Sequence, residues 1–150
     1  MDVREVLKRN RLFEKFSDTG VALIATVADL REFPPGTPIF VENMLGESLF
    51  IVARGKVEFR VQAGQVNVAL EQIGPGEHFG QLCLIKPGPR QVGAVAVGDC
   101  ALIEIARRPF LKLQSQKPQA CLKLQLAICE DYVDAASAAA GLMRQVLGLR

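Results

Sequence analysis

Between residues 30 and 105 the sequence consists of short β-like runs, and this pattern limits the possible folds more than any other feature. The runs are about five residues long, and turns such as Pro34-Pro35-Gly36 and Gly74-Pro75-Gly76 separate them. We expect the run Leu49–Ala53 to end at Arg54-Gly55. Many short strands at regular spacing are typical of a sandwich or a barrel, so the sequence predicts a double-stranded β-helix, or jelly-roll barrel.

Both ends of the chain have helical patterns instead. Apolar residues among charges predict a short amphipathic helix over Val3–Asn10, and Ser17 or Asp18 is suited to cap a second helix. Pro118 opens the last and longest helix, in the first turn, where proline is tolerated. We therefore expect one α+β, mainly β domain over residues 1–150, with a helical part at 1–29, a β-barrel at 30–105 and C-terminal helices at 107–150.

The composition fits a globular protein and argues against several classes of partner. Hydrophobic residues make up 49% and charged residues 23% of the chain, as in a folded domain and unlike a disordered one. The formal net charge of +2 is too small to predict a nucleic-acid or membrane partner. No apolar run reaches the ~20 residues of a membrane span, and the N-terminus lacks the apolar core of a signal peptide, so we expect a cytoplasmic protein.

Few side chains are suited to catalysis or metal binding. The cysteines Cys83, Cys100, Cys121 and Cys129 form no C-x-x-C pair, and His78 is the only histidine, so we expect no metal site. The sequence has no Ser/His or Cys/His arrangement and no paired carboxylates beside His78, so we expect no enzyme activity. We expect His78 to be a surface residue.

The stretch from Phe79 to Arg90 has the features of a phosphate site. It predicts a short helical turn that begins at Gly80, then a Pro/Gly loop, then an arginine that opens a strand. Backbone N–H groups at a helix start attract anions, and a guanidinium can hold the same phosphate with two hydrogen bonds. The pattern also fits an ordinary connection whose arginine is solvated or pairs with Glu77 or Glu104, and the residues alone leave these interpretations open.

Several motifs in the chain resemble one known family. Phe79-Gly80-Gln81-Leu82-x-Leu84-Ile85 followed by Pro89-Arg90 resembles the phosphate-binding cassette of cyclic-nucleotide-binding domains, which occur in the catabolite activator, in cyclic-nucleotide-dependent kinases and in cyclic-nucleotide-gated channels. Further matches are Pro35-Gly36-x-x-Ile39-Phe40, Leu49-Phe50-Ile51-Val52-x-x-Gly55-x-Val57 and Gly76-x-x-Phe79-Gly80. The resemblance runs from about Leu12 to the C-terminus and implies a jelly-roll that binds a cyclic nucleotide, cAMP or cGMP, without a metal.

The resemblance implies roles for individual residues. Arg90 matches the arginine that pairs with the cyclic phosphate, and Gln81 stands where the family has a glutamate that accepts a hydrogen bond from the ribose 2′-hydroxyl. Glutamine keeps an acceptor but is neutral, so we expect a weaker bond to the sugar. The complete set of expected ligand-binding residues is Phe79, Gly80, Gln81, Leu82, Cys83, Arg90 and Gln91.

The positions that would contact the base depart from the family pattern. Gln91 is bulkier than the usual Ser or Ala, and Gly93 supplies no side chain where a Thr often meets the base. Ala135 and Ala136 fall where the catabolite activator presents two hydroxyl residues to adenine. Two interpretations stay open: the domain binds a cyclic nucleotide with altered affinity or preference, or it keeps the fold and has lost the ligand.

The last helix carries two apolar stripes and therefore needs two surfaces to bury them. We expect one stripe to pack on the barrel and the other to form a homodimer; the alternative is one broad stripe buried in a monomer. The predicted dimer seam has heptad spacing and comprises Leu122, Leu126, Cys129, Val133, Ala136, Ala140, Met143 and Leu147. The stripe beside it comprises Leu124, Ile128, Tyr132, Ala135, Ala139, Leu142 and Val146.

The resemblance also bears on partners. Transcription factors of the family carry a helix-turn-helix domain after the long helix, whereas this chain stops at Arg150, so we expect no direct DNA binding. We expect a non-enzymatic regulatory module that senses a cyclic nucleotide and acts on an unidentified protein partner. The alternative is a degenerate, ligand-free domain that serves as an adaptor between proteins.

Overall fold

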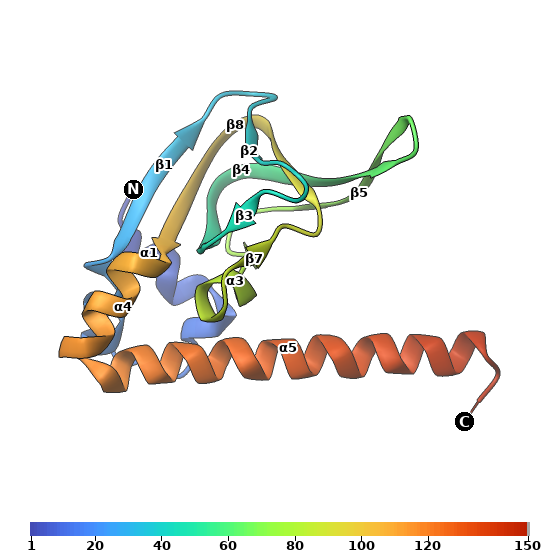
Figure 1. Ribbon diagram of the computed structural model, residues 1–150. Coiled ribbons are helices and arrows are strands. Elements are labelled where there is room, and N and C mark those ends of the chain that lie inside the picture. The colour runs from blue at the N-terminus through green and yellow to red at the C-terminus, as the bar shows by residue number, and fades with distance from the viewer. Residues whose placement is uncertain (150) are drawn as a thin grey trace.

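The structure is a computed structural model that describes residues 1–149 (Figure 1). Arg150, the last residue of the predicted helical region 107–150, lies outside the described residues. The helical elements are α1 (Val3–Arg9), the 3-10 turn η1 (Arg11–Phe13), α2 (Asp18–Ala25), α3 (Leu82–Ile85), α4 (Arg107–Gln116) and α5 (Pro118–Val146). The strands are β1 (Ala28–Phe33), β2 (Pro38–Phe40), β3 (Leu45–Gly46), β4 (Ser48–Ala63), β5 (Val66–Ile73), β6 (His78–Phe79), β7 (Gly88–Pro89) and β8 (Gly93–Ala106).

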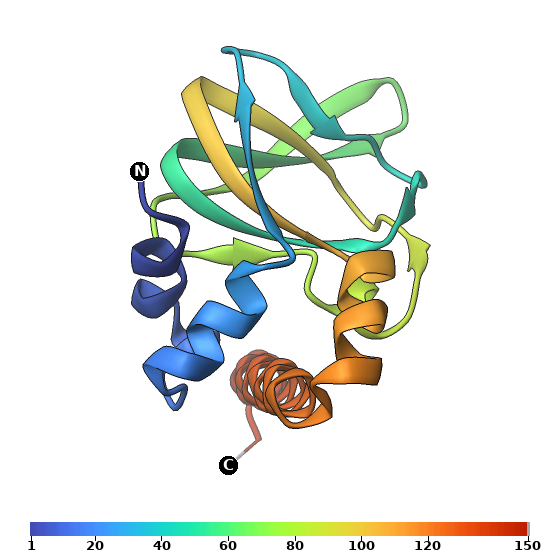
Figure 2. The same ribbon diagram turned by 90° about the vertical axis from the view of Figure 1, so that its left-hand side faces the viewer.

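The strands form an antiparallel jelly-roll, which confirms the predicted fold. The larger sheet has the order β1-β8-β4-β5, with β2 added to β8 and β6 added to β4, while β3 pairs with β7. The two longest strands, β4 and β8, pair from Ser48↔Ala106 to Arg60↔Gly93 and form the centre of the sheet. Figure 2 shows the barrel above the helices, with α5 seen end-on between the N-terminal helices and α4.

The strand β4 does not end at Arg54-Gly55, so that prediction is wrong. Its pairing with β8 shifts register on both sides of Arg54, and Gly55 has a φ of 81°, which glycine adopts without strain. A Cβ at Gly55 would overlap the carbonyl oxygen of Asp99 on β8. The glycine therefore forms a bulge at which one continuous strand bends, where the sequence pattern suggests a break.

The boundary between the N-terminal helices and the barrel also differs slightly from the prediction. Ser17 caps α2, since its Oγ accepts a hydrogen bond from the Gly20 amide at 3.1 Å. β1 begins at Ala28, inside the region 1–29 predicted to be helical, because Ala28 already pairs with Ile105 of β8. The start of β1 is decided by pairing with a strand far away in the sequence, so the local sequence pattern does not show it.

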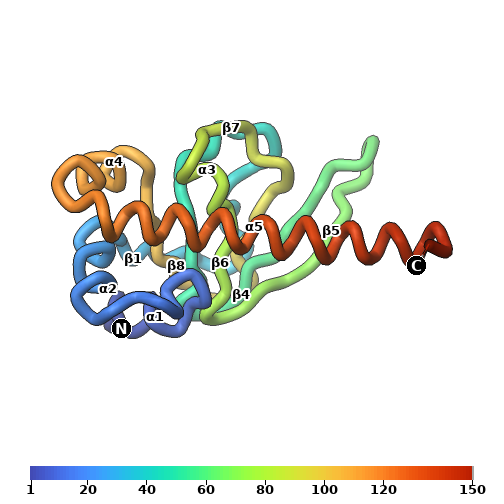
Figure 3. Tube along the Cα trace, turned by 90° about the horizontal axis from the view of Figure 1, so that it is seen from below, coloured from blue at the N-terminus to red at the C-terminus, as the bar shows by residue number. Residues whose placement is uncertain are grey.

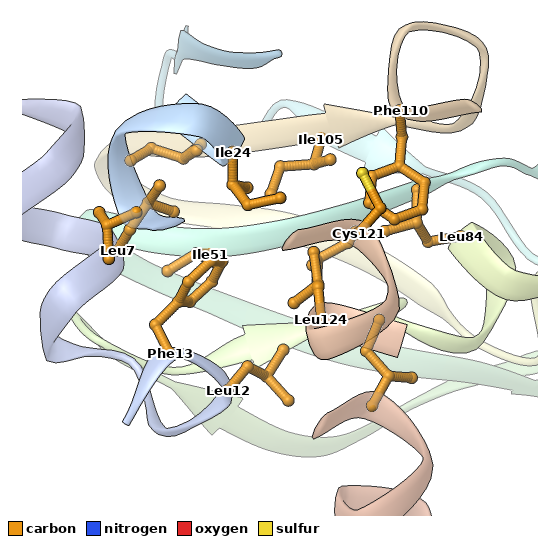
Figure 4. Packing of buried hydrophobic residues seen from close by; sticks show 14 of the residues in the cluster. Leu7, Leu12, Phe13, Ile24, Ile51, Leu84, Ile105, Phe110, Cys121 and Leu124 are labelled. Carbon is orange, nitrogen blue, oxygen red and sulfur yellow. The ribbon is translucent and has the colours of Figure 1, made fainter. Parts of the chain in front are cut away.

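Two hydrophobic clusters fill the interior. One is mainly aliphatic and joins the N-terminal helices, the barrel and the start of α5; Figure 4 shows Leu7, Ile24, Leu84 and Leu124 among its members. The other lies in the barrel and contains the five phenylalanines Phe33, Phe40, Phe50, Phe59 and Phe79. Leu84 belongs to α3, so the first cluster ties the predicted phosphate turn to the same core as α5.

The long helix α5 passes beneath the barrel and continues beyond it (Figures 1 and 3). Its first turns bury Cys121, Leu124 and Ile128 in the aliphatic cluster. Every residue of the predicted dimer seam is exposed, and so is every described residue from Tyr132 onward. The expected packing of the second stripe on the barrel is therefore correct for its first two members and wrong beyond Ile128. Within residues 1–149, no helix has the combination of length and hydrophobicity that crossing a membrane requires.

Leu124 is expected to stabilise the contact between α5 and the rest of the domain. Leu124→Ala should lower the free energy of unfolding by about 2–5 kcal/mol, because it removes a fully buried side chain. Leu111→Ala, at an exposed position of α4, should cost less than about 1 kcal/mol. Urea unfolding followed by circular dichroism measures both values, and equal losses would contradict the burial of the first turns of α5.

Candidate functional site

A cavity of about 480 Å³ lies between the β4–β5 hairpin, the β6–α3 turn and the segment that leads into β8. This volume is in the range of small-molecule sites. The lining residues that the sequence did not predict include Leu70, Glu71 and Ile73 of β5 and Arg11 of η1. All of the predicted ligand-binding residues line the cavity, namely Phe79, Gly80, Gln81, Leu82, Cys83, Arg90 and Gln91.

Arg90 is a buried cation in the wall of this cavity, with 6% of its surface exposed. Its guanidinium lies over the rings of Phe40 and Phe50, at 4.2 and 5.7 Å from their centroids. Nη2 donates to the carbonyl oxygen of Ser48 at 3.0 Å, and Nη1 donates to that of Gly80 at 3.5 Å. Within residues 1–149, the buried Nε has no hydrogen-bond partner.

No carboxylate in the described part of the chain forms an ion pair with Arg90. Glu104 pairs with Arg31 at 2.9 Å, and Glu77 accepts a hydrogen bond from the Gly74 amide at 2.8 Å, so neither of the two expected carboxylates is its partner. Burial lowers the pKa of Arg90, because removal from water disfavours the charged form. A buried charge without a counter-ion is costly, and an anion that entered the cavity would offset this cost.

Two glycines make room for the guanidinium. A Cβ at either Gly46 or Gly80 would overlap the Arg90 side chain. Gly80 also has a φ of 72°, a conformation that other residues adopt only with strain. Gly80 belongs to the predicted motif, whereas Gly46 carries no signal in the sequence because its contact with Arg90 depends on the pairing of β3 with β7.

The turn that follows Gly80 is short and bonded within itself. The Cys83 amide donates to the Gly80 carbonyl oxygen at 3.2 Å, and α3 has only four residues. At the end of α3, Arg107 donates to the carbonyl oxygens of Leu84, at 2.7 Å, and of Ile85. Sequence reasoning missed Arg107, because its role depends on how α3 lies beside the start of α4.

The side chain of His78 is buried, with 1% of it exposed, so its predicted surface position is wrong. Its Nδ1 accepts a hydrogen bond from Nδ2 of Asn10 at 3.0 Å, and the same amide donates to the Gly76 carbonyl oxygen at 2.8 Å. Nε2 therefore carries the proton and donates to Oδ2 of Asp131 at 3.0 Å. Burial lowers the pKa of His78 by more than Asp131 raises it, so the ring is neutral at neutral pH.

Asp131 of α5 is the common acceptor of this network, with 9% of its side chain exposed. Besides His78, it accepts hydrogen bonds from Nε of Arg11 at 2.7 Å and from Nε2 of Gln81 at 2.9 Å. Burial raises the pKa of the Asp131 carboxyl, but the hydrogen bonds from His78 and Arg11 and the charge of Arg11 outweigh burial and lower it overall. No sequence pattern indicated Asp131, because Gln81 and Arg11 are 50 and 120 residues away along the chain.

The side of the cavity where a base would lie is poor in polar side chains. Of the four predicted base-side positions, only Gln91 lines the cavity that residues 1–149 form. Ala135 and Ala136 are exposed on α5 beyond Asp131, and Gly93 begins β8. The cavity therefore has a buried cation at Arg90, whereas three of the four positions expected to contact a base do not line it.

The sequence has curated relatives that support an assignment. The family model described as cyclic nucleotide-binding domain matches residues 30–117. The chain is 37% identical to the cyclic AMP receptor protein of Thermus thermophilus over 113 residues, which cover 75% of this chain and 52% of that protein. It is 31% identical to a cAMP-dependent protein kinase regulatory subunit of Eremothecium gossypii over 105 residues, which cover 70% of this chain and 22% of that protein.

Solved structures give the same result. The N-terminal domain of a transcriptional regulator from Streptomyces coelicolor A3(2) superimposes with a TM-score of 0.80 at 25% identity, over 89% of this chain and 94% of that one. The catabolite activator protein of Thermus thermophilus gives 0.74 at 32% identity, over 89% of this chain and 63% of that one. The chain spans about half or less of the curated relatives it matches. It belongs to the cyclic nucleotide-binding domain family.

Proposed function

We propose that this chain is a regulatory module that binds a cyclic nucleotide by its phosphate and acts on a protein partner through α5. The observation that carries the proposal is Arg90, a buried guanidinium in the cavity wall with no counter-ion and an unpartnered Nε among the described residues. A cyclic phosphate has one negative charge and two exocyclic oxygens, which suit a planar guanidinium. The relatives named for cyclic AMP support the same class of ligand.

The proposed role is regulatory and includes no catalysis. A histidine that acts as a general base needs a free ring nitrogen within reach of a substrate. Both ring nitrogens of His78, the only histidine, form hydrogen bonds within the domain, to Asn10 and to Asp131. The histidine therefore has a structural role in the network that supports α5.

A ligand-free adaptor is the second candidate, and the base side of the cavity favours it. Gly93, Ala135 and Ala136 provide no polar group to select a base, and discrimination between bases requires specific polar partners. Arg90 already donates to the carbonyl oxygens of Ser48 and Gly80, which offsets part of the cost of its burial. In this case protein contacts through α5 or through the strands would carry the function.

The exposed half of α5 suits a homodimer. From Val133 onward its predicted seam has heptad spacing, and the side chains of Val133, Met143 and Leu147 are all more than half exposed. The small residues Ala136 and Ala140 between them would allow close approach of a second helix. A second copy of this chain presents a matching seam, so two α5 helices side by side would cover each other's apolar surface.

Millimolar cyclic AMP should raise the midpoint of thermal unfolding, because a ligand that binds only the native state stabilises it by mass action. At 100 times Kd the gain is about 2.7 kcal/mol, or about 5–10 °C for a domain of this size. Arg90→Ala should abolish the shift. Arg54→Ala is the matched control, because it removes an exposed arginine paired with Glu32 outside the cavity, and it should keep the shift.

The same melts with cyclic GMP and a cyclic dinucleotide would define the class of ligand. A flat response of the unmodified protein to all three would contradict nucleotide binding and favour the adaptor. A shift that persists in Arg90→Ala would contradict the role of Arg90.

A pair of alanines tests the dimer. Ala140 lies on the predicted seam, whereas Ala138 lies on the opposite side of the helix at 100° per residue, and both are exposed. We expect a dimer by sedimentation equilibrium at micromolar concentration. Ala140→Glu should produce monomers, because it places like charges across the seam, while Ala138→Glu should leave the dimer intact. Equal behaviour of the two variants, or a monomer without any substitution, would rule out this interface.

A further inference from the structure

The side chain of Gln81 contacts α5 and also borders the cavity. Its Nε2 donates to Oδ2 of Asp131 at 2.9 Å, and the residue lines the cavity beside Gly80. The same oxygen accepts from Nε2 of His78 at 3.0 Å, while Oδ1 accepts from Nε of Arg11 at 2.7 Å. Hydrogen bonds from His78 of β6 and Arg11 of η1 thus hold the Asp131 carboxylate in place beside Gln81.

An ionised carboxylate only accepts hydrogen bonds, so Asp131 selects the NH2 end of the Gln81 amide. If the amide were flipped, Oε1 of Gln81 would lie 2.9 Å from Oδ2 of Asp131, and neither oxygen could donate a hydrogen bond. The contact therefore fixes the orientation of the Gln81 amide group. With Nε2 bound to Asp131, the carbonyl oxygen Oε1 is the end of the amide that a ligand hydroxyl can use, and within residues 1–149 it receives no hydrogen bond.

The contact also makes residues 81 and 131 depend on each other. A glutamate at position 81, the residue of the family pattern, would place a second carboxylate where an oxygen of Asp131 lies 2.9 Å from the side chain. Two carboxylates that close do not both ionise without a large cost, so one of them takes up a proton. Glutamine removes this conflict and still provides an acceptor.

The contact between Gln81 and Asp131 lies where α5 leaves the core. Ile128 is the last residue of α5 that is buried in the core, and from Tyr132 onward the helix is exposed. Asp131 therefore lies at the boundary between the packed half and the exposed half of the helix. Its bond to Gln81 is a direct polar link between the cavity wall and that boundary.

We propose that Asp131 is a positioning residue: it orients the Gln81 amide so that Oε1 accepts the ribose 2′-hydroxyl, and it couples that contact to α5. The ribose part rests on the proposed function. The dependence of residue 81 on residue 131 does not, and it is measurable without any ligand.

The first experiment measures thermal unfolding without ligand at pH 7.5. Gln81→Glu should lower the midpoint by about 5 °C, because it opposes two carboxylates. Gln91→Glu adds the same charge to the cavity wall outside the Asp131 network, and it should lower the midpoint by much less. Asp131→Asn should lower the midpoint less in the Gln81→Glu protein than in the unmodified protein, because it weakens the bonds to Arg11 and His78 in both but relieves the repulsion only in the first.

The pH dependence separates repulsion from a change of shape. The deficit of Gln81→Glu relative to the unmodified protein should shrink between pH 7.5 and pH 5, because protonation of one carboxyl removes the repulsion. The other charged or titratable groups around the pair, Arg11, His78 and Glu77, are common to both proteins. If Gln81→Glu lowers the midpoint only as much as Gln91→Glu does, the contact between residues 81 and 131 is overturned. The same holds if neither lower pH nor Asp131→Asn reduces the loss caused by Gln81→Glu.

The second experiment compares cyclic AMP with 2′-deoxy cyclic AMP by calorimetry. The unmodified protein should prefer cyclic AMP by about fivefold, the value of one net hydrogen bond. Asp131→Ala removes the acceptor that holds the Gln81 amide in one orientation, which should bring the ratio nearer one with less effect on 2′-deoxy cyclic AMP. An unchanged ratio would overturn the orienting role. Binding of neither nucleotide would contradict the proposed function and its ribose contact, while the melts still decide the pairing.

Discussion

The buried guanidinium of Arg90 is the interaction on which the rest of the site depends. A cation that is removed from water needs hydrogen bonds or other favourable contacts to offset its lost hydration. In residues 1–149 the compensation comes from two carbonyl oxygens and from the faces of Phe40 and Phe50, without a carboxylate. This arrangement requires glycine at positions 46 and 80, because any side chain there would displace the arginine. The aromatic cluster and the glycines thus hold a positive charge at the edge of a cavity, where an anion would complete its coordination.

The second constraint is the attachment of α5 beneath this cavity. Leu84 of α3 and Leu124 of α5 share one core cluster, and Asp131 joins α5 to the β6–α3 turn through Gln81 and His78. A shared apolar cluster and two hydrogen bonds therefore connect the wall of the cavity to a helix whose second half is exposed. A ligand that changed the wall would act first on the segment of α5 next to that exposed half. The architecture suits a module that converts binding into a change of protein contacts.

The sequence predicted the features that depend on local pattern. Turn residues between short apolar runs indicated the jelly-roll, Pro118 marked the start of α5, and one contiguous motif placed the expected ligand residues around a single cavity. The features that it missed depend on pairing between distant segments. Gly55 looks like a strand end until β8 lies beside it, and His78 looks like a surface residue until Asn10 and Asp131 enclose it.

The ¹⁵N NMR signal of the Arg90 Nε–H group tests most directly whether Arg90 binds the cyclic phosphate. The signal is assigned by its loss in Arg90→Lys. This group is buried and has no partner within the described residues, so it reports an anion that reaches the guanidinium. We predict that the signal shifts and saturates as cyclic AMP is added to the folded protein. A signal that stays in place at millimolar cyclic AMP, while the rest of the spectrum remains that of the native fold, would contradict binding of the cyclic phosphate by Arg90.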